Sequence, residues 1–271
     1  MRKIIWLLSV LSLISFSACS ENQSGKFKGE LRIAGGTAHL DVMKEVAEKI
    51  MKENPGVNVS IAGGGSGVGI KQVGEGIIEI GNSGRDLKQS EIDTYGLVPH
   101  KMAIDGIAVI VNPKSKINQL TSEQVKDIFT GKIKNWKELG GANKTINVYT
   151  RDEKSGTRTT FESLLLGKGT KIVKSANYVK SNGEMKTSVS NDADAIGYTA
   201  VGYLDETVKA LPVDGIEPSL ENVKERKYKV QRYLYMVTKG EPRGLTKHFI
   251  DTVLSPYGQE VVKKNHYIPV K

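Results

Sequence analysis

Short apolar segments alternate along the chain with segments whose apolar residues recur at helical spacing. Residues 31–34 and 57–61 are predicted strands, and the apolar positions of 40–51 fall on one face of a helix. Further along, the β-branched run 146–150 predicts a strand, and 159–166 predicts the helix after it. Turns rich in Gly, Ser and Thr separate these strands from the helices. This order predicts an open α/β sheet with a ligand site at its strand ends.

Small hydroxyl side chains occupy these turns. Thr37 follows two glycines after the first strand, and Ser66 lies in a glycine-rich turn before a helix predicted over 70–76. Ser83 lies in a further turn, which follows a strand predicted over 77–80. Glycine lets the backbone approach a ligand closely, and a hydroxyl can donate a hydrogen bond. We therefore expect these turns to face a polar ligand.

The segment 151–157, Arg-Asp-Glu-Lys-Ser-Gly-Thr, is the strongest single indication of ligand chemistry. It places Arg151 at a strand end, four residues ahead of a Ser-Gly-Thr turn that opens a helix. The unpaired N–H groups and positive dipole end of a helix start favour a bound anion. Arginine adds a planar fork that suits tetrahedral oxyanions. Such a turn by itself is most often only a helix cap, so the predicted anion site depends on the other turns as well.

The length of the chain predicts two lobes. About 250 residues follow residue 18, which is more than the simplest single core holds. The strand 106–111 is expected to cross into the second lobe, the alternating segment 228–238 to return, and helices split at Ser255-Pro256 to pack on the first lobe. The predicted division is residues 1–18 as a signal peptide, 19–28 as a tether, 29–104 with 230–271 as lobe I, and 105–229 as lobe II.

The N-terminal segment predicts export from the cytoplasm. Arg2 and Lys3 precede an apolar run over 4–14, and Ser17-Ala18 lead into Cys19, which is the layout of a secretory signal peptide. The apolar run is too short for a membrane span. Cys19 is the only cysteine, so an intramolecular disulfide is excluded.

Charge and motif content argue against several other functions. Removing residues 1–18 lowers the formal charge from +9 to +7, but the lysines are scattered without interleaved aromatics, so nucleic acid is not an expected partner. The four histidines are isolated, which disfavours a zinc site, and His39 is predicted to be a partly exposed loop side chain. No Ser-x-x-Lys or P-loop lysine accompanies the serine-rich turns. A phosphate-ester hydrolase or phosphotransferase using Ser66 or Ser155 stays an alternative that lacks a base.

Taken in order, several segments resemble the phosphate-binding proteins of phosphate ABC transporters, in the periplasmic-binding-protein superfamily. The resemblance covers nearly all of the chain after the signal peptide. Its segments are 35–37, 63–67, 80–83, 129–136, 151–157, 195–198, 233–238 and 249–261.

The resemblance implies a two-lobed type II fold, with a mixed, mainly parallel sheet flanked by helices in each lobe and a hinge between the lobes. It implies a monomeric receptor, without enzymatic activity, metal or cofactor, that delivers inorganic phosphate to a membrane permease and its ATPase. The segment before Cys19 resembles a bacterial lipobox, which implies a lipidated cysteine and a membrane-anchored lipoprotein. Carried over by position, the phosphate-binding residues are Thr37, Ala38, Ser66, Ser83, Gly84, Arg151, Ser155, Gly156 and Thr157, with Glu153 (or Asp152) orienting Arg151.

One position departs from the family pattern. Some relatives carry an aspartate where this chain has Gly84, and there it accepts the proton of a protonated phosphate and repels sulfate. A backbone N–H or the Ser83 hydroxyl is a candidate replacement, while Asp86 is more typical of a helix-start carboxylate. A receptor for another oxyanion, such as sulfate or molybdate, and a surface adhesin or sensor therefore stay open as alternatives.

Overall fold

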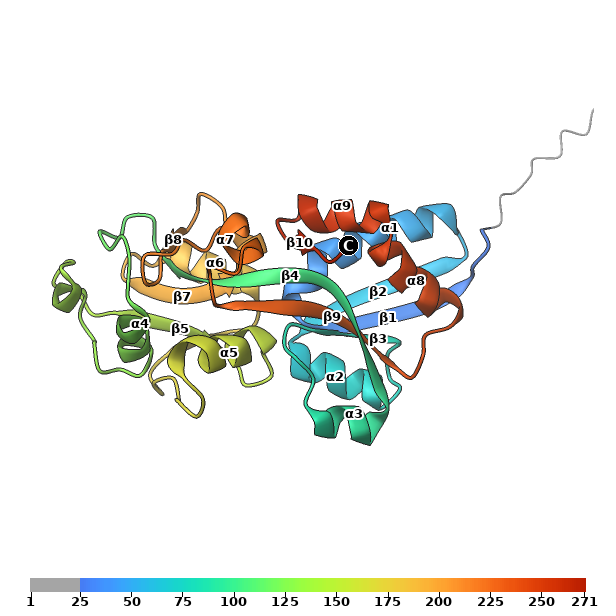
Figure 1. Cartoon of the computed structure of the whole chain (residues 1–271), viewed down its shortest axis with the longest axis horizontal. Coiled ribbons are helices and arrows are strands. Elements are labelled where there is room, and N and C mark those ends of the chain that lie inside the picture. Colours follow the sequence, from blue (N-terminus) through green and yellow to red (C-terminus); the bar gives the residue numbers. More distant parts are fainter. Residues whose placement is uncertain (1–24) are drawn as a thin grey trace, which may run out of the picture.

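The computed structural model describes residues 25–271, so the predicted signal peptide, Cys19 and most of the predicted tether lie outside the described residues. Figure 1 shows two halves side by side, with two long strands running from one half into the other. Within residues 25–271, no helix combines the length and apolarity needed to cross a bilayer.

The first half begins with three parallel strands in the order β2-β1-β3. They are β1 (Gly29–Gly35), β2 (Val57–Gly64) and β3 (Ile80–Ser83), followed by helices α1 (Leu40–Glu53), α2 (Ser66–Gly74) and α3 (Gln89–Tyr95). Two boundaries differ from the sequence prediction. Helix α2 starts at Ser66 rather than at residue 70, because Gly65, with φ 88°, turns the chain directly into it. Strand β3 starts at Ile80 rather than at 77, and Ile77 is 49% exposed.

Two antiparallel strands join the halves. Strand β4 (Leu97–Val111) pairs with β9 (Gln231–Lys239) from Leu97 opposite Lys239 to Gly106 opposite Gln231. At the other edge of β9, β3 continues the first sheet, and β4 continues into the second half by pairing with β7. The expected crossing strand 106–111 is therefore the last part of a longer strand.

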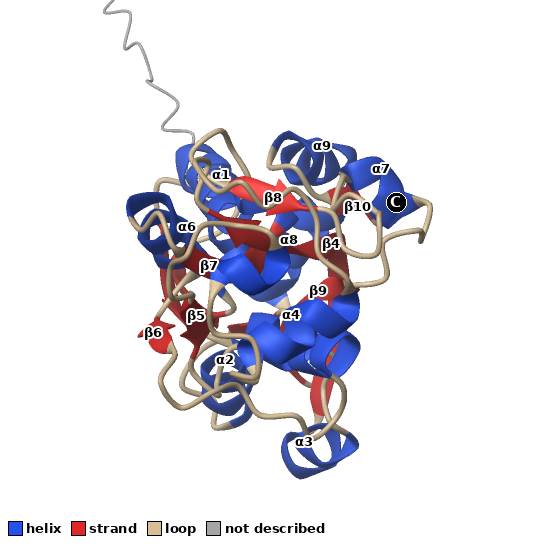
Figure 2. Ribbon diagram, turned by 90° about the vertical axis from the view of Figure 1, so that its left-hand side faces the viewer, coloured by secondary structure: helices blue, strands red, loops and turns tan. Residues whose placement is uncertain are grey.

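The second half is built on β4 and four shorter strands, of which β5 is parallel to β6 and β7. The strands are β5 (Asn147–Arg151), β6 (Asn177–Val179), β7 (Ala195–Ala200) and β8 (Lys209–Leu211), and the helices are α4 (Ser122–Phe129), α5 (Gly156–Phe161), α6 (Asn182–Asn191) and α7 (Leu220–Lys224). Figure 2 views this half end-on, with helices around its strands. Helix α4 is capped by Thr121, whose Oγ1 accepts from the N–H of Gln124 at 3.1 Å. The predicted helix 159–166 is α5 followed by a π-helical turn, Glu162–Leu166.

The chain ends on the first half. Helices α8 (Gly244–Leu254) and α9 (Pro256–Lys264) meet at Ser255, which caps α9, and both pack against α1 of the first half. The last strand, β10 (Ile268–Pro269), pairs with β4.

Each half has its own apolar core. In the first half, the strands pack on α1, α8 and α9 through residues such as Leu31, Val46 and Phe249. In the second half, three of the buried aromatic rings of the core pack against one another. Phe161 stacks on Tyr198 with ring centroids 4.0 Å apart, and Phe129 meets Phe161 edge-on at 4.8 Å. Because Phe161 belongs to α5, its packing on the other two rings fixes the helix that carries Ser155–Thr157 at its start.

We expect Phe161→Ala to lower the free energy of unfolding by about 3–5 kcal/mol, because it removes a fully buried ring and leaves a cavity. Urea denaturation measures the loss. Tyr178→Ala is the matched control, since Tyr178 is 57% exposed and its loss should stay within about 0.5 kcal/mol. Equal effects of the two substitutions would contradict this view of the core.

Candidate anion-binding site between the two halves

A small cavity lies where the turns of the two halves meet. It offers about 10 Å³ of space for the centre of a water-sized sphere, enough for one small guest. The first half lines it with Gly36, Thr37, Ala38, Gly65, Ser66 and Gly84. The second half contributes Arg151, Ser155, Gly156 and Thr157, and Arg232 comes from β9.

The hydroxyls of Thr37 and Ser66 are held by bonds that they accept. Thr37 Oγ1 accepts from the backbone N–H and the Nδ2 of Asn182, at 3.2 and 3.1 Å. These two bonds use both lone pairs of the hydroxyl oxygen and leave its hydrogen as a donor. Ser66 Oγ accepts from the N–H of Gly84 at 2.9 Å. Both hydroxyls are therefore oriented to donate.

The start of α5 supplies the same kind of group from the opposite wall. Ser155 Oγ caps the helix by accepting from Arg158 N at 3.2 Å, and Thr157 Oγ1 accepts from Arg232 Nη1 at 3.0 Å. The N–H groups of Gly156 and Thr157 belong to the first helical turn, where no carbonyl of the helix can reach them. A Cβ at Gly156 would lie 2.1 Å from Ser66 Oγ, so glycine is what allows the two walls to approach this closely.

Arg151 brings a positive charge to this cavity, and no carboxylate within residues 25–271 pairs with its guanidinium. Its side chain is 1% exposed, and its Nε and Nη2 donate to the carbonyl oxygens of Val179 and Lys180 at 3.2 and 2.9 Å. Nη1 is buried and has no hydrogen-bond partner within residues 25–271. Burial lowers the pKa of Arg151, because desolvation disfavours its charged form. The backbone carbonyls fix the guanidinium and leave Nη1 to donate to an anionic acceptor.

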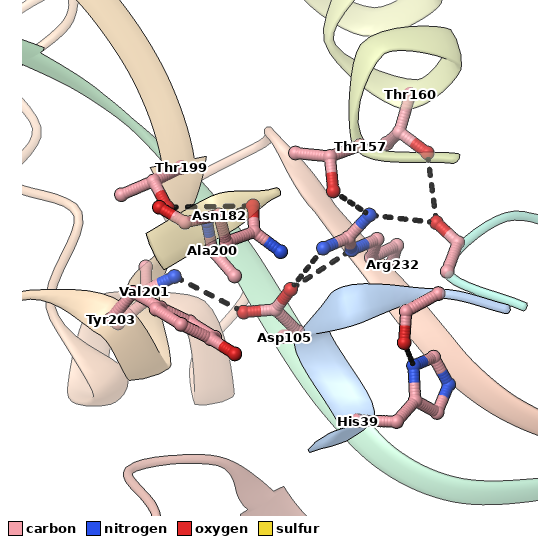
Figure 3. A network of polar contacts seen from close by, with 12 residues as sticks. His39, Asp105, Thr157, Thr160, Asn182, Thr199, Ala200, Val201, Tyr203 and Arg232 are labelled. Atoms are coloured by element: carbon pink, nitrogen blue, oxygen red, sulfur yellow. Dashed lines mark hydrogen bonds and ion pairs between the residues drawn. The ribbon is translucent and has the colours of Figure 1, made fainter. Parts of the chain in front are cut away.

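A second buried arginine, Arg232, was not among the sequence candidates. Its Nε and Nη2 approach Asp105 Oδ2 at 2.9 and 2.7 Å, and its Nη1 donates to Gly84 O at 2.9 Å as well as to Thr157. In Figure 3, its side chain lies between Asp105 of β4 and Thr157 at the start of α5. Burial raises the pKa of the Asp105 carboxyl, and the charge of Arg232 opposes that rise. The sequence does carry one indication of a buried arginine here, because Arg232 lies within the largely apolar strand 231–239.

Other hydrogen bonds also join the halves around the cavity. Tyr203 donates its hydroxyl to Thr37 O at 2.7 Å, and Thr160 Oγ1 donates to Gly84 O at 3.3 Å. The N–H of Gly67 donates to Lys154 O at 2.9 Å. With the Asn182–Thr37 bonds, these contacts require the two halves to be closed together.

Several residues are not placed as the sequence indicated. Glu153 is exposed and is not a partner of Arg151, whose guanidinium is held by backbone carbonyls instead. Ser83 donates to Arg85 O at 2.8 Å and does not line the cavity. Gly84 does line it, but its N–H is used by Ser66. Asp86 is exposed and accepts from Tyr235 Oη, so it does not supply a carboxylate to the cavity.

His39 is fully buried rather than partly exposed, because the turn Thr37–His39 packs it beneath the site. Its Nδ1 lies 3.1 Å from Gly36 O. Burial, together with the charge of Arg232, lowers the pKa of His39 to about 3. Within residues 25–271, no group of three or more His, Cys, Asp or Glu side chains is placed to hold a metal ion.

The chain is similar to known proteins along most of its length. A sequence model described as the PBP superfamily domain matches residues 20–256. The phosphate-binding protein PstS of Bacillus subtilis is 40% identical over 99% of this chain and 94% of that protein. PstS of Borreliella burgdorferi is 32% identical over 100% of both chains. The crystal structure of a putative phosphate ABC transporter substrate-binding protein with bound phosphate, from Clostridium perfringens, superposes with a TM-score of 0.85 at 40% identity, covering 90% of this chain and 100% of that one.

The burial of His39 predicts a specific pH dependence of stability. The unfolded chain binds a proton at this histidine below about pH 6.5, whereas the folded chain does not until about pH 3. Acidification between these values therefore favours unfolding, by up to about 1.4 kcal/mol per pH unit. We expect anion-free protein to show this slope in urea denaturation. His39→Asn, whose amide can still donate to Gly36 O, should flatten it. The exposed His266→Asn should leave it unchanged, and an identical slope in both variants would contradict the assignment.

Proposed function

The chain belongs to the PBP superfamily, among the PstS phosphate-binding proteins, and from this membership we propose that it captures inorganic phosphate between its two halves and delivers it to an ABC permease. The single observation that supports this most is a cavity that brings oriented donors together with Arg151, whose Nη1 has no hydrogen-bond partner within residues 25–271. Residues that carry hydroxyls and helix-start N–H groups line the same cavity from both halves. Such a set matches a small tetrahedral oxyanion.

The site can bind an anion because protein hydrogen-bond donors replace the water molecules that the anion loses. Moving a multiply charged anion out of water is costly unless hydrogen bonds and opposite charge compensate it. The hydroxyls of Thr37, Ser66, Ser155 and Thr157 supply donors whose oxygens already accept protein hydrogen bonds. Arg151 adds a charge-assisted hydrogen bond, which is roughly twice as strong as a neutral one.

Binding is coupled to closure in this proposal. Lobe I comprises residues 29–104 and 230–271, lobe II comprises 105–229, and β4 and β9 form the hinge. Because each lobe carries only part of the donor set, the full set exists only when they are closed. Arg232 supports the closed form, since its Nη1 donates to Gly84 in lobe I and Thr157 in lobe II. An anion that binds only the closed form shifts the population toward it.

The cellular setting follows from the N-terminal sequence and the family. We propose that the chain is exported, lipidated at Cys19 and tethered to the outer side of the cell membrane, where it acts as a monomeric binding protein rather than an enzyme. Its partners are then a membrane permease with its ATPase, and its lipid anchor.

A second candidate function is a receptor for another oxyanion, such as sulfate. The observation that favours it is the absence of any carboxylate from the cavity lining within residues 25–271. Gly84 stands where some relatives carry an aspartate, and a Cβ there would lie 2.7 Å from Arg232 Nη1. Arg232 thus takes the space that a side chain at position 84 would need. A protonated anion finds no charged acceptor in this cavity.

We expect phosphate to bind the mature chain in isothermal titration calorimetry, and Arg151→Ala to weaken that binding roughly 30-fold to 5,000-fold. This range corresponds to about 2–5 kcal/mol for removing one partner of a buried, hydrogen-bonded charge pair. Arg243→Ala is the matched control, because Arg243 is exposed and does not line the cavity. Thermal unfolding verifies that both variants fold. Unchanged affinity in a folded Arg151→Ala protein would remove the basis of the assignment.

Competition between phosphate and sulfate over a pH series separates the two candidate functions. A cavity that offers donors without a carboxylate favours the less protonated form of an anion. Phosphate should therefore outcompete sulfate increasingly as the pH rises and phosphate loses a proton, while sulfate keeps its charge. Sulfate binding tighter than phosphate at every pH would support the second candidate. A preference for phosphate that is greatest at low pH would mean that an acceptor for its proton exists.

A further inference from the structure

A second, larger cavity adjoins the anion site and shares one wall with it. By the same measure it offers about 520 Å³, and Arg232 lines both cavities. We call it the hinge groove, because strands β4 and β9 contribute Ile104 and Tyr233 to it, with Val223 of α7 and Leu164 beside them. Its size is typical of a site for a small organic molecule.

Leu164 gives the hinge groove an exposed apolar side chain. It is 51% exposed, one of a few large apolar side chains exposed to that degree in the described part of the chain. It lies in the π-helical turn Glu162–Leu166, and such turns occur frequently at functional sites. An apolar group in the groove would cover Leu164 together with the half-buried Ile104.

The rim of the hinge groove carries positive charge that the fold does not neutralise. Lys88, Lys224 and Arg226 line the groove and are exposed, and none of them forms a salt bridge within residues 25–271. The two other arginines of the lining are already paired, Arg85 with Glu91 and Arg232 with Asp105. The lining carboxylate, Asp86, accepts a hydrogen bond from Tyr235 Oη.

We propose that the hinge groove binds a small organic phosphate monoester. The phosphate group would contact the unpaired cations of the rim, since lysine and arginine favour phosphate oxygens. The organic part would cover the apolar wall, which inorganic phosphate cannot do. The anion cavity is too small for such an ester, because it offers about 10 Å³ of space for the centre of a water-sized sphere against about 520 Å³ in the hinge groove.

Occupancy of the groove would be coupled to the anion site, a step that depends on the proposed phosphate-binding function. The groove is lined by Lys88 of the first half and by Thr160 and Arg226 of the second, so its full lining requires closure. Its floor, Arg232, bonds to Gly84 and Thr157 in that same closed arrangement. Two ligands that both favour one closed state raise each other's affinity by the same factor. The groove ligand is therefore a positive effector of phosphate capture.

The test uses phenyl phosphate as the probe, titrated calorimetrically into the mature chain. We expect it to bind to the wild type and to Arg151→Ala alike, and to bind at least tenfold more weakly to the double variant Lys224→Glu/Arg226→Glu. The matched control is Lys52→Glu/Lys263→Glu, with the same change of net charge on exposed positions of α1 and α9. That control should stay within twofold of the wild type. Saturating phenyl phosphate should raise the affinity of the wild type for inorganic phosphate severalfold, but not that of Lys224→Glu/Arg226→Glu.

Three results would overturn the proposal. They are no binding of phenyl phosphate at millimolar concentration, equal weakening by the two double variants, and loss of binding in Arg151→Ala, which would place the ester in the anion cavity. Failure of the proposed function looks different. In that case inorganic phosphate does not bind to the wild type, while phenyl phosphate still distinguishes the two double variants.

Discussion

The anion site depends on the burial of the Arg151 guanidinium without a carboxylate beside it. An ion placed in a low-dielectric interior is costly unless it is paired, yet here two backbone carbonyls compensate it only in part. The remaining positive potential is reinforced by helix-start N–H groups and oriented hydroxyls. Because the fold satisfies each hydroxyl oxygen and leaves its hydrogen, the cavity is complementary to an acceptor that carries negative charge.

Arg232 has the opposite arrangement and a different role. Asp105 neutralises it, and its nitrogens are used by protein acceptors on both sides of the hinge. Because its hydrogen bonds reach Gly84 in the first half and Thr157 in the second, Arg232 fixes the distance between the two halves at this point. The same side chain lines both the small cavity and the hinge groove.

Parts of the site were predictable because each lies in a local strand–turn–helix unit. Thr37, Ser66 and Ser155 follow β1, β2 and β5, and strand ends that meet at one edge of a sheet bring such turns together. The sequence prediction was wrong where it took a residue close in the chain as the partner of Arg151. Glu153, two residues from Arg151, points to solvent, whereas the groups that hold Arg151 come from residues 28 and 29 positions away.

The sequence by itself determined the alternation of strands and helices, the donor-rich turns and the arginine at the end of β5, because these features depend on local backbone preference and short-range periodicity. Only the tertiary structure decided which charges are paired. Arg232 and Asp105 are 127 residues apart in the chain and meet because β4 and β9 are neighbours in the sheet. Their pairing follows from the register of these two strands, and the burial of His39 follows from the packing of its turn. The space at position 84 is taken by Arg232. No local sequence pattern encodes these long-range contacts.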